Sequence, residues 1–396
     1  MKPPILFKPT QANESALKAS SPAERHCFAV RGNVPNKAEA IFKLGMASGA
    51  SCPRNDKRFM FHVVACLVLF LLLGPRASVC AEPLKIRVGH FPNVTHASAL
   101  IGRATGHFEK AFGENTQIDW KTFNAGPEAI EALFAGEIDI LYVGPNPAIN
   151  GFIRSKGEAL RVIAGVASGG AAFVVRPEAH IERFEDIDGK RVAIPQKGNT
   201  QDVALLSLMK QKGLVPRTQG GTVEIFNISS GDQITAFVKK QVDAVWTVEP
   251  WVSRLVSEAN GKILFEEKEL WPEGKYATTL LVARKKFMDQ HPDLVQKWIE
   301  GHVEITDYIN KNLQEAKEIF NKELQYETGK FLPPSYLDEC FKKISFTYDS
   351  MEHSVQESAK CAAAIGYLGR NVIDLKNLYE LSFLNRAKNR LRNEEV

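Results

Sequence analysis

The amino-acid sequence predicts an α/β fold with two lobes, and three observations support this prediction. Short apolar strands alternate with helical patterns along residues 85–284, which is typical of βαβ units and largely parallel sheets. The segment 127–140 resembles the segment 231–244, because each is a helix followed by a turn and an Asp that leads into a strand. From residue 291 onward the pattern is almost wholly helical. We therefore expect two similar α/β lobes with parallel-rich sheets, flanking helices and a helical C-terminal region.

In the first half of this region, local patterns define each element. Residues 117–123 alternate with a period of two and are expected to form a strand. Gly126 and Pro127 then open a helix that Gly136 ends, because Pro is well tolerated in the first helical turn. The other expected elements are a helix at 99–108 and strands at 85–88, 138–143, 161–167 and 171–176.

The same cycle restarts in the second half. A turn leads into a strand at 192–194, and the strand at 277–284 is long enough to return to the first lobe. Lobe I is therefore expected to comprise residues 82–172 and 278–396, and lobe II residues 173–277. The remaining expected elements are helices at 202–212 and 232–240 and strands at 220–226 and 242–246.

A leader is expected at residues 1–81. Its uncharged apolar run at 61–73 follows basic residues, and small residues at Val79 and Ala81 precede a potential cut before Glu82, as in a secretory signal peptide. The run is shorter than the roughly 20 residues that span a membrane. Cleavage before Cys80, with lipid attachment, is the alternative. We therefore expect an exported, periplasmic protein.

The charge balance argues against a nucleic-acid partner. The leader holds 11 Lys and Arg against 4 Asp and Glu, so the remaining chain, with 39 against 42, has a net charge of −3. That chain lacks the basic footprint of a nucleic-acid-binding protein.

The cysteines offer no metal site. Four of the six lie in the leader, and only Cys340 and Cys361 remain, without the spacing of a metal-binding motif. In an exported protein they could form a disulfide or remain two buried thiols. No cofactor, metal or catalytic residue is expected.

Three strand-to-helix turns carry residues suited to anion binding. The turns contain Asn93 and His96, Gly144 and Asn146, and Asn199 with Thr200. A helix start presents backbone N–H groups that lack intrahelical partners and can bind an anion. We expect these turns to form a pocket between the sheets, although each Asn or Thr could instead simply cap its helix.

The chain resembles the periplasmic substrate-binding proteins of ABC transporters, in the branch that binds aliphatic sulfonates, taurine and nitrate. The resemblance covers about residues 85 to 320 and rests on the order and spacing of several short motifs. These are Arg87-Val-Gly-His-Phe-Pro92, Gly106-His-Phe-Glu-Lys110, the stretch 123–139, Gly144-Pro-Asn-Pro147, Asp188-Gly-Lys-Arg-Val-Ala-Ile194, Gly198-Asn-Thr200, the stretch 242–250 and His291-Pro-Asp-Leu-Val295.

This resemblance implies a type II-like periplasmic binding protein fold in which the lobes close on a ligand. It implies capture of a small anion, best matched by an aliphatic sulfonate, and delivery to a membrane permease by a monomer. Nitrate, taurine or a thiamine-precursor ligand is the alternative, and a pyrimidine-precursor enzyme on the same fold is a further one. That enzyme needs a Cys-rich cluster, which residues 82–339 lack because they contain no Cys.

The resemblance also identifies candidate ligand contacts beyond those turns. Asn199 and Thr200 match the turn that holds the ligand's anionic group, and Gln201 follows them. Glu249 would repel an anion, so it would pair with a ligand amine or cap its own helix. The full set of expected ligand-binding residues is Asn93, His96, Gly144, Asn146, Ser168, Gly170, Asn199, Thr200, Gln201 and Glu249.

Overall fold

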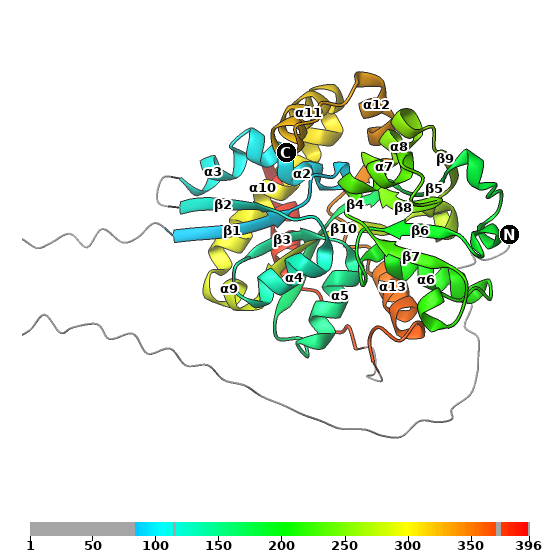
Figure 1. Cartoon of the computed structure of the whole chain (residues 1–396). Coiled ribbons are helices and arrows are strands. Elements are labelled where there is room, and N and C mark those ends of the chain that lie inside the picture. The colour runs from blue at the N-terminus through cyan, green and yellow to red at the C-terminus, as the bar shows by residue number, and fades with distance from the viewer. Residues whose placement is uncertain (1–83, 114–115, 370–373, 395–396) are drawn as a thin grey trace, which may run out of the picture. The chain divides into compact units, whose positions relative to one another are not determined.

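Two β-sheets organise the chain (Figure 1). The computed structural model describes residues 84–113, 116–369 and 374–394. The expected signal peptide, with its apolar core at 61–73 and its cut after Ala81, lies outside the described residues. Within the described residues, no helix has both the length and the apolar character that crossing a membrane requires.

The first sheet has six strands in the order β11-β4-β10-β3-β1-β2. β1 lies parallel to β2 and β3, whereas β10 runs antiparallel to β3 and β4, and β11 antiparallel to β4. We call this sheet and its helices lobe I. Its strands are β1 (Leu84–His90), β2 (Thr116–Thr122), β3 (Ile140–Val143), β4 (Leu160–Gly169), β10 (Ala277–Arg284) and β11 (Ile344–Phe346).

The second sheet has five strands in the order β7-β6-β8-β5-β9. β6 lies parallel to β7 and β8, and β5 runs antiparallel to β8 and β9. We call this sheet and its helices lobe II. Its strands are β5 (Ala171–Val175), β6 (Arg191–Ile194), β7 (Glu224–Asn227), β8 (Ala244–Val248) and β9 (Lys262–Glu266).

The fold class is as predicted, but both sheets are mixed rather than parallel-rich. The chain passes from the first sheet to the second between Gly169 and Ala171 and returns between Glu266 and Ala277. The strands next to these crossings, β5 and β10, run against the parallel strands of their sheets. The strands β9 and β11 carry little periodic signal and were not expected.

Helices cover both faces of each sheet. In lobe I, one apolar layer joins the sheet to α2, α10 and α11, and the other joins it to α4, α5 and α13. In lobe II, α7 and α8 cover one face and α6 the other. The helices are α2 (Ala97–Ala104), α3 (His107–Phe112), α4 (Gly126–Phe134), α5 (Pro145–Arg154), α6 (Thr200–Gln211), α7 (Ser230–Val238), α8 (Trp251–Ala259), α9 (Lys285–Gln290), α10 (Pro292–Lys311), α11 (Leu313–Thr328), α12 (Pro334–Lys342), α13 (Glu352–Ala364) and α14 (Ser382–Glu394).

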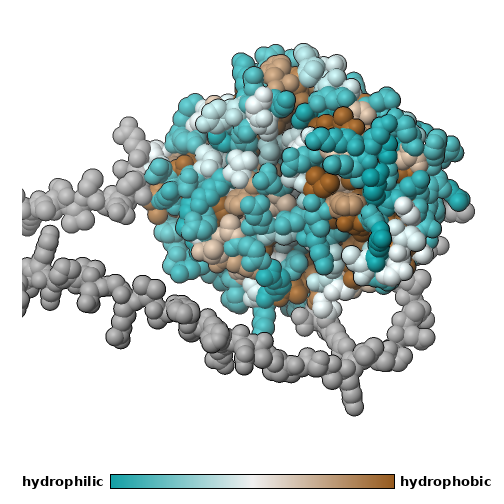
Figure 2. Space-filling model, viewed as in Figure 1, coloured by the Kyte–Doolittle hydropathy of each residue, from teal (hydrophilic) through white to brown (hydrophobic). Residues whose placement is uncertain are grey.

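The visible surface is mainly hydrophilic, with small separate apolar areas (Figure 2). Apolar residues scattered in this way are normal for a globular protein. The large apolar side chains instead fill the layers between helices and sheets, where Trp246 and Trp298 are fully buried.

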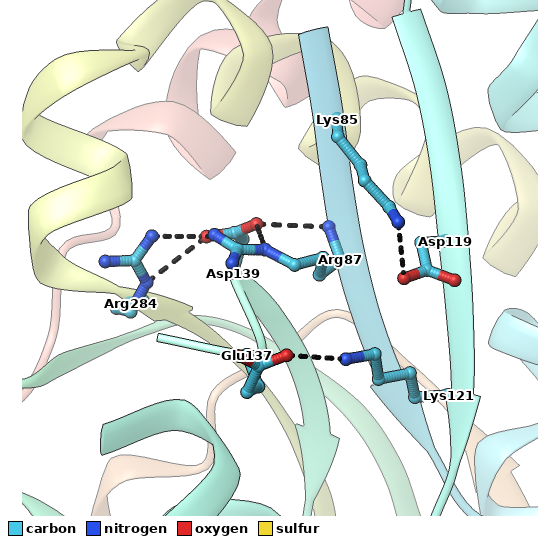
Figure 3. A network of polar contacts seen from close by, with 7 residues as sticks. All are labelled: Lys85, Arg87, Asp119, Lys121, Glu137, Asp139 and Arg284. Carbon is cyan, nitrogen blue, oxygen red and sulfur yellow. Dashed lines mark hydrogen bonds and ion pairs between the residues drawn. The ribbon is translucent and has the colours of Figure 1, made fainter. Parts of the chain in front are cut away.

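A buried carboxylate fixes one end of the lobe I sheet. Asp139, just before β3, accepts hydrogen bonds from the backbone N–H, Nε and Nη2 of Arg87 in β1, at 3.1, 2.8 and 3.0 Å. Arg284, the last residue of β10, donates to the same carboxylate through Nη2 at 2.5 Å. Figure 3 shows both guanidinium groups converging on Asp139. The carboxylate therefore ties together three strands that are distant in sequence.

Lobe II contains the same arrangement of one aspartate and two arginines at other positions in the chain. Asp243, just before β8, accepts from the backbone N–H, Nε and Nη2 of Arg191 in β6, at 3.0, 3.0 and 2.9 Å. Arg176, next to the end of β5, donates at 2.5 Å. Burial alone would raise the pKa of Asp243, but the hydrogen bonds from Arg191 and Arg176 outweigh it and lower the pKa to about 2. The repeat expected from sequence therefore extends to individual contacts.

Replacing Asp139 with Asn should lower the free energy of unfolding by about 3–5 kcal/mol, because two guanidinium groups lose their charged, buried acceptor. Urea denaturation followed by circular dichroism would measure the loss. Glu137→Gln is the matched control, because Glu137 is exposed and forms a surface ion pair with Lys121 at 3.0 Å (Figure 3). That variant should change stability little. Equal losses in the two variants would contradict the structural role of Asp139.

Candidate functional site

The candidate site is a pocket of about 40 Å³ where the two lobes meet. It lies at the carboxyl ends of parallel strands, where open α/β sheets hold their ligands. Six of the ten expected residues line it: Asn93, His96, Gly144, Asn199, Thr200 and Gln201. The other lining residues are Phe91, Thr95, Asn124, Ala125, Gly126, Pro195, Ser230, Val248, Thr278 and Thr279.

Helix starts supply much of this lining. Gly126 and Ser230 are the first residues of α4 and α7, Thr200 is the first residue of α6, and Gly144 immediately precedes α5. Two of these helices belong to lobe I and two to lobe II. Each start presents backbone N–H groups that have no partner within the helix and carries the positive end of the helix dipole. The pocket is therefore electrostatically suited to an anion.

The side chain of Asn93 is oriented by the opposite lobe. Trp251, the first residue of α8, donates its indole N–H to Asn93 Oδ1 at 2.8 Å. This bond orients the Asn93 amide, whose NH₂ group can then donate to a ligand. The adjacent backbone also joins the lobes, because the Val94 N–H donates to the carbonyl oxygen of Glu249 at 3.0 Å.

His96 is a neutral donor in this pocket. The backbone N–H of Phe91 donates to His96 Nδ1 at 3.4 Å, so the neutral ring carries its proton on Nε2. Burial, and to a smaller extent the neighbouring His90, lowers the pKa of His96 well below its ordinary value. The ring therefore stays uncharged near neutral pH in the absence of an anion.

Two buried hydroxyl groups in the pocket have no partner. Among the described residues, Thr200 Oγ1 and Thr279 Oγ1 have no hydrogen-bond partner, although their residues are 6% and 1% exposed. An unsatisfied buried hydroxyl costs about 1–3 kcal/mol. A ligand oxygen in the pocket would remove this cost, which makes both hydroxyls candidate donors.

Asn199 serves its own helix. Its Oδ1 accepts the backbone N–H of Thr200 at 2.7 Å, as a helix cap does. The capping interpretation therefore applies to its oxygen, while its NH₂ group is still available in the pocket lining. Both roles that the sequence left open are compatible with the geometry.

Four expected residues lie away from this pocket. Asn146 points its amide toward α13, where Nδ2 donates to the carbonyl oxygen of Ser358 at 3.3 Å. Ser168 Oγ accepts the backbone N–H of Tyr276 at 3.3 Å. Gly170 and Glu249 border a different, enclosed space beside Lys343.

Glu249 is held by protein groups rather than left open for a ligand. Its carboxylate accepts from Lys343 Nζ at 2.9 Å and from the backbone N–H and Oγ of Ser253 at 3.0 and 2.9 Å. The Cys340 thiol donates to it at 3.2 Å, and the buried residues Cys340 and Cys361 are not joined in a disulfide. The disulfide alternative is therefore wrong. Through Lys343 and Cys340, Glu249 connects lobe II to the C-terminal region, which explains why the Glu249 side chain is buried.

Sequence reasoning missed several lining residues. Asn124 precedes the start of α4, and that strand-to-helix turn carried the same signal as the three turns chosen. Thr278 and Thr279 lie near the start of the returning strand β10, and nothing in an apolar strand pattern indicates that its hydroxyls face a pocket. Thr278 Oγ1 donates to the carbonyl oxygen of Gly169 at 2.7 Å and so fastens the two crossing points together.

The described residues contain no cluster of His, Cys, Asp and Glu suited to a metal ion. The pocket lining includes no Asp, Glu, Lys or Arg. What the site offers is a set of neutral hydrogen-bond groups, several of them amide or hydroxyl donors.

Comparison with known proteins identifies the family. The model of the NMT1-like family matches residues 80–321. The taurine-binding periplasmic protein of Escherichia coli is 27% identical over 59% of this chain and 69% of its own length. A putative aliphatic sulfonates-binding protein of Bacillus subtilis is 26% identical over 82% of this chain and 96% of its own length.

Solved structures show the same fold. The alkanesulfonate-binding protein SsuA of Xanthomonas axonopodis pv. citri, bound to MOPS, superposes with a TM-score of 0.62 at 23% identity, covering 75% of this chain and 98% of its own. The periplasmic nitrate-binding protein NrtA of Synechocystis superposes with a TM-score of 0.63 at 13% identity, covering 78% and 89%. At these identities the likeness establishes the periplasmic binding protein fold.

The bond between Trp251 and Asn93 should appear as an energetic coupling. Trp251→Phe and Asn93→Ala should each destabilise the protein, and the double variant should lose about 0.5–1.5 kcal/mol less than the two single losses added together. The reason is that each single change already removes the shared hydrogen bond. Urea unfolding of the four proteins would give the coupling. Strictly additive losses would show that the bond contributes nothing to joining the lobes.

Proposed function

We propose that this chain, which belongs to the NMT1-like family, is the solute-binding component of an ABC importer and captures a small organic anion, an aliphatic sulfonate. The observation that carries the proposal is the pocket itself. Helix starts from both lobes meet there, together with the unpartnered hydroxyls of Thr200 and Thr279. The taurine-binding and aliphatic sulfonate-binding names of its relatives support the same class of solute.

A sulfonate suits this set of groups chemically. It stays ionised throughout the physiological pH range and spreads its charge over three oxygen atoms. Several neutral donors can therefore satisfy it without a bound cation. The backbone N–H groups of the helix starts, the amide of Asn93, Nε2–H of His96 and the two threonine hydroxyls are donors of this kind. Closure of the lobes would complete the set, because each lobe supplies only part of it.

The six expected residues in the pocket therefore remain our proposed ligand contacts, with Thr279 added. Asn146, Ser168, Gly170 and Glu249 lie outside the lining of this pocket, so we do not include them among the proposed contacts. Nitrate is the second candidate, because it is also a small anion and the nitrate-binding protein NrtA has the same fold. We assign no catalytic activity, since the similar proteins that are named for a function are binding proteins.

The site of action follows from the same proposal. Relatives and structural neighbours are periplasmic proteins by name. We propose that this chain is exported by its leader, acts as a monomer in the periplasm and passes its solute to a membrane permease.

Propane-1-sulfonate should bind the protein, and propan-1-ol should not. The alcohol has the same alkyl chain but lacks the sulfonate group, so it would leave buried donors unsatisfied at about 1–3 kcal/mol each. Isothermal calorimetry would compare the affinities directly, and the sulfonate alone should raise the melting temperature, because it binds only the folded state. Equal affinity for the alcohol would refute the anion pocket.

Sulfonate binding near pH 6 should be accompanied by partial uptake of a proton. The free His96 ring is neutral there because its pKa is lowered well below 6.5. A neighbouring anion favours the charged ring and raises that pKa, so affinity should increase as the pH falls through the bound-state pKa toward the lower pKa of the free ring. Uptake should vanish by about pH 8.

Calorimetry in two buffers of different ionisation enthalpy would measure this uptake. His96→Gln retains a hydrogen-bond donor but cannot titrate, so its uptake should disappear. Undiminished proton uptake in that variant would show that another group titrates.

A further inference from the structure

We propose that the pocket selects anions that lack an ammonium group, so that it takes an alkanesulfonate and rejects a zwitterionic aminosulfonate such as taurine. This inference rests on the proposed function and narrows its substrate class. It decides between the two kinds of ligand that the relatives' names suggest.

The first observation is the absence of a counter-ion for a cation. No Asp or Glu belongs to the pocket lining. The two buried carboxylates beside it, Asp202 and Glu249, have partners of their own. Asp202 accepts the Gly198 N–H at 2.7 Å and the Tyr367 O–H at 2.6 Å, and Glu249 pairs with Lys343.

The second observation is that the side chains of Asn93, Asn199 and His96 each use an acceptor atom within the protein. Asn93 Oδ1 accepts from Trp251, and Asn199 Oδ1 accepts from the Thr200 N–H. His96 Nδ1 accepts from the Phe91 N–H. Each of these side chains keeps its donor hydrogens, and one acceptor lone pair of each is already used. An ammonium group, which only donates, would be left with neutral oxygen atoms such as the hydroxyls of Thr200 and Thr279 and would meet no carboxylate.

The third step is energetic. Moving an ammonium group out of water is expensive unless a carboxylate or several oxygen atoms replace its hydration. The helix starts around the pocket add an unfavourable term, because their positive dipole ends repel a cation. The same features favour the sulfonate end of either ligand. The difference between the binding free energies of the two ligands therefore reports the effect of the ammonium group alone.

The test compares ethanesulfonate with taurine, which differ only by that group. Calorimetry on the unmodified protein should show taurine binding at least about 30-fold more weakly. Equal or tighter binding of taurine would overturn the inference while leaving the anion pocket intact. If neither binds, the proposed function fails, and this inference fails with it.

A designed carboxylate should reverse the preference. Ser230→Asp places an acid at the first residue of α7, where the helix dipole favours a negative charge. The affinity ratio of taurine to ethanesulfonate should rise at least about tenfold, because the ammonium gains a partner and the sulfonate is repelled.

Thr218→Asp is the matched control. It adds the same charge at an exposed position of lobe II outside the pocket lining, so the ratio should stay as in the unmodified protein. A rise in both variants would show that net charge, rather than the pocket, sets the preference. An unchanged ratio in a folded Ser230→Asp protein would contradict the inference. The comparison of the two ligands on the unmodified protein does not depend on whether either variant folds.

Discussion

The bridging of two arginines by one buried aspartate is the interaction on which the rest of the structure depends. In lobe I the aspartate precedes β3, and in lobe II its counterpart precedes β8. Both bridges lie at the amino ends of parallel strands, and the pocket lies at the carboxyl ends of the same sheets. The ion pairs thus hold the strands together at one end of each sheet. The strand-to-helix turns, with backbone N–H groups that can bind a ligand, lie at the other end.

The C-terminal region connects the two lobes through polar contacts. Tyr367, beyond α13, reaches Asp202 in the first turn of α6, and Lys343, beyond α12, reaches Glu249 before α8. Both carboxylates belong to lobe II, and both hydroxyl and ammonium partners come from chain that follows the return to lobe I. These contacts occupy Asp202 and Glu249, two buried acids that directly follow lining residues in the sequence, so the joining of the lobes also provides these carboxylates with partners.

Much of the fold followed from local sequence patterns, because periodicity and turn residues act over a few positions. The strand-to-helix turns and the repeat between 127–140 and 231–244 are of this kind. The function of a given polar side chain was less predictable, because its partner lies far away in the sequence. Asn146 and Asn93 look alike as turn residues, yet one bonds Ser358 and the other bonds Trp251, separated by 212 and 158 positions. Glu249 likewise gave no local sign of Lys343, and no pattern in β10 set Thr279 apart.

Gly144 has a consequence for the working cycle of the protein. A Cβ atom at this position would lie 2.5 Å from Thr200 Oγ1, so the absence of a side chain is what allows the turn before α5 to touch the start of α6. The backbone angles there suit any residue, and the requirement is one of space alone. A methyl group at this position would contact the Thr200 hydroxyl and separate the two turns unless that side chain rotated. Under the proposed function, we expect the wider spacing to shorten the time for which an anion stays bound.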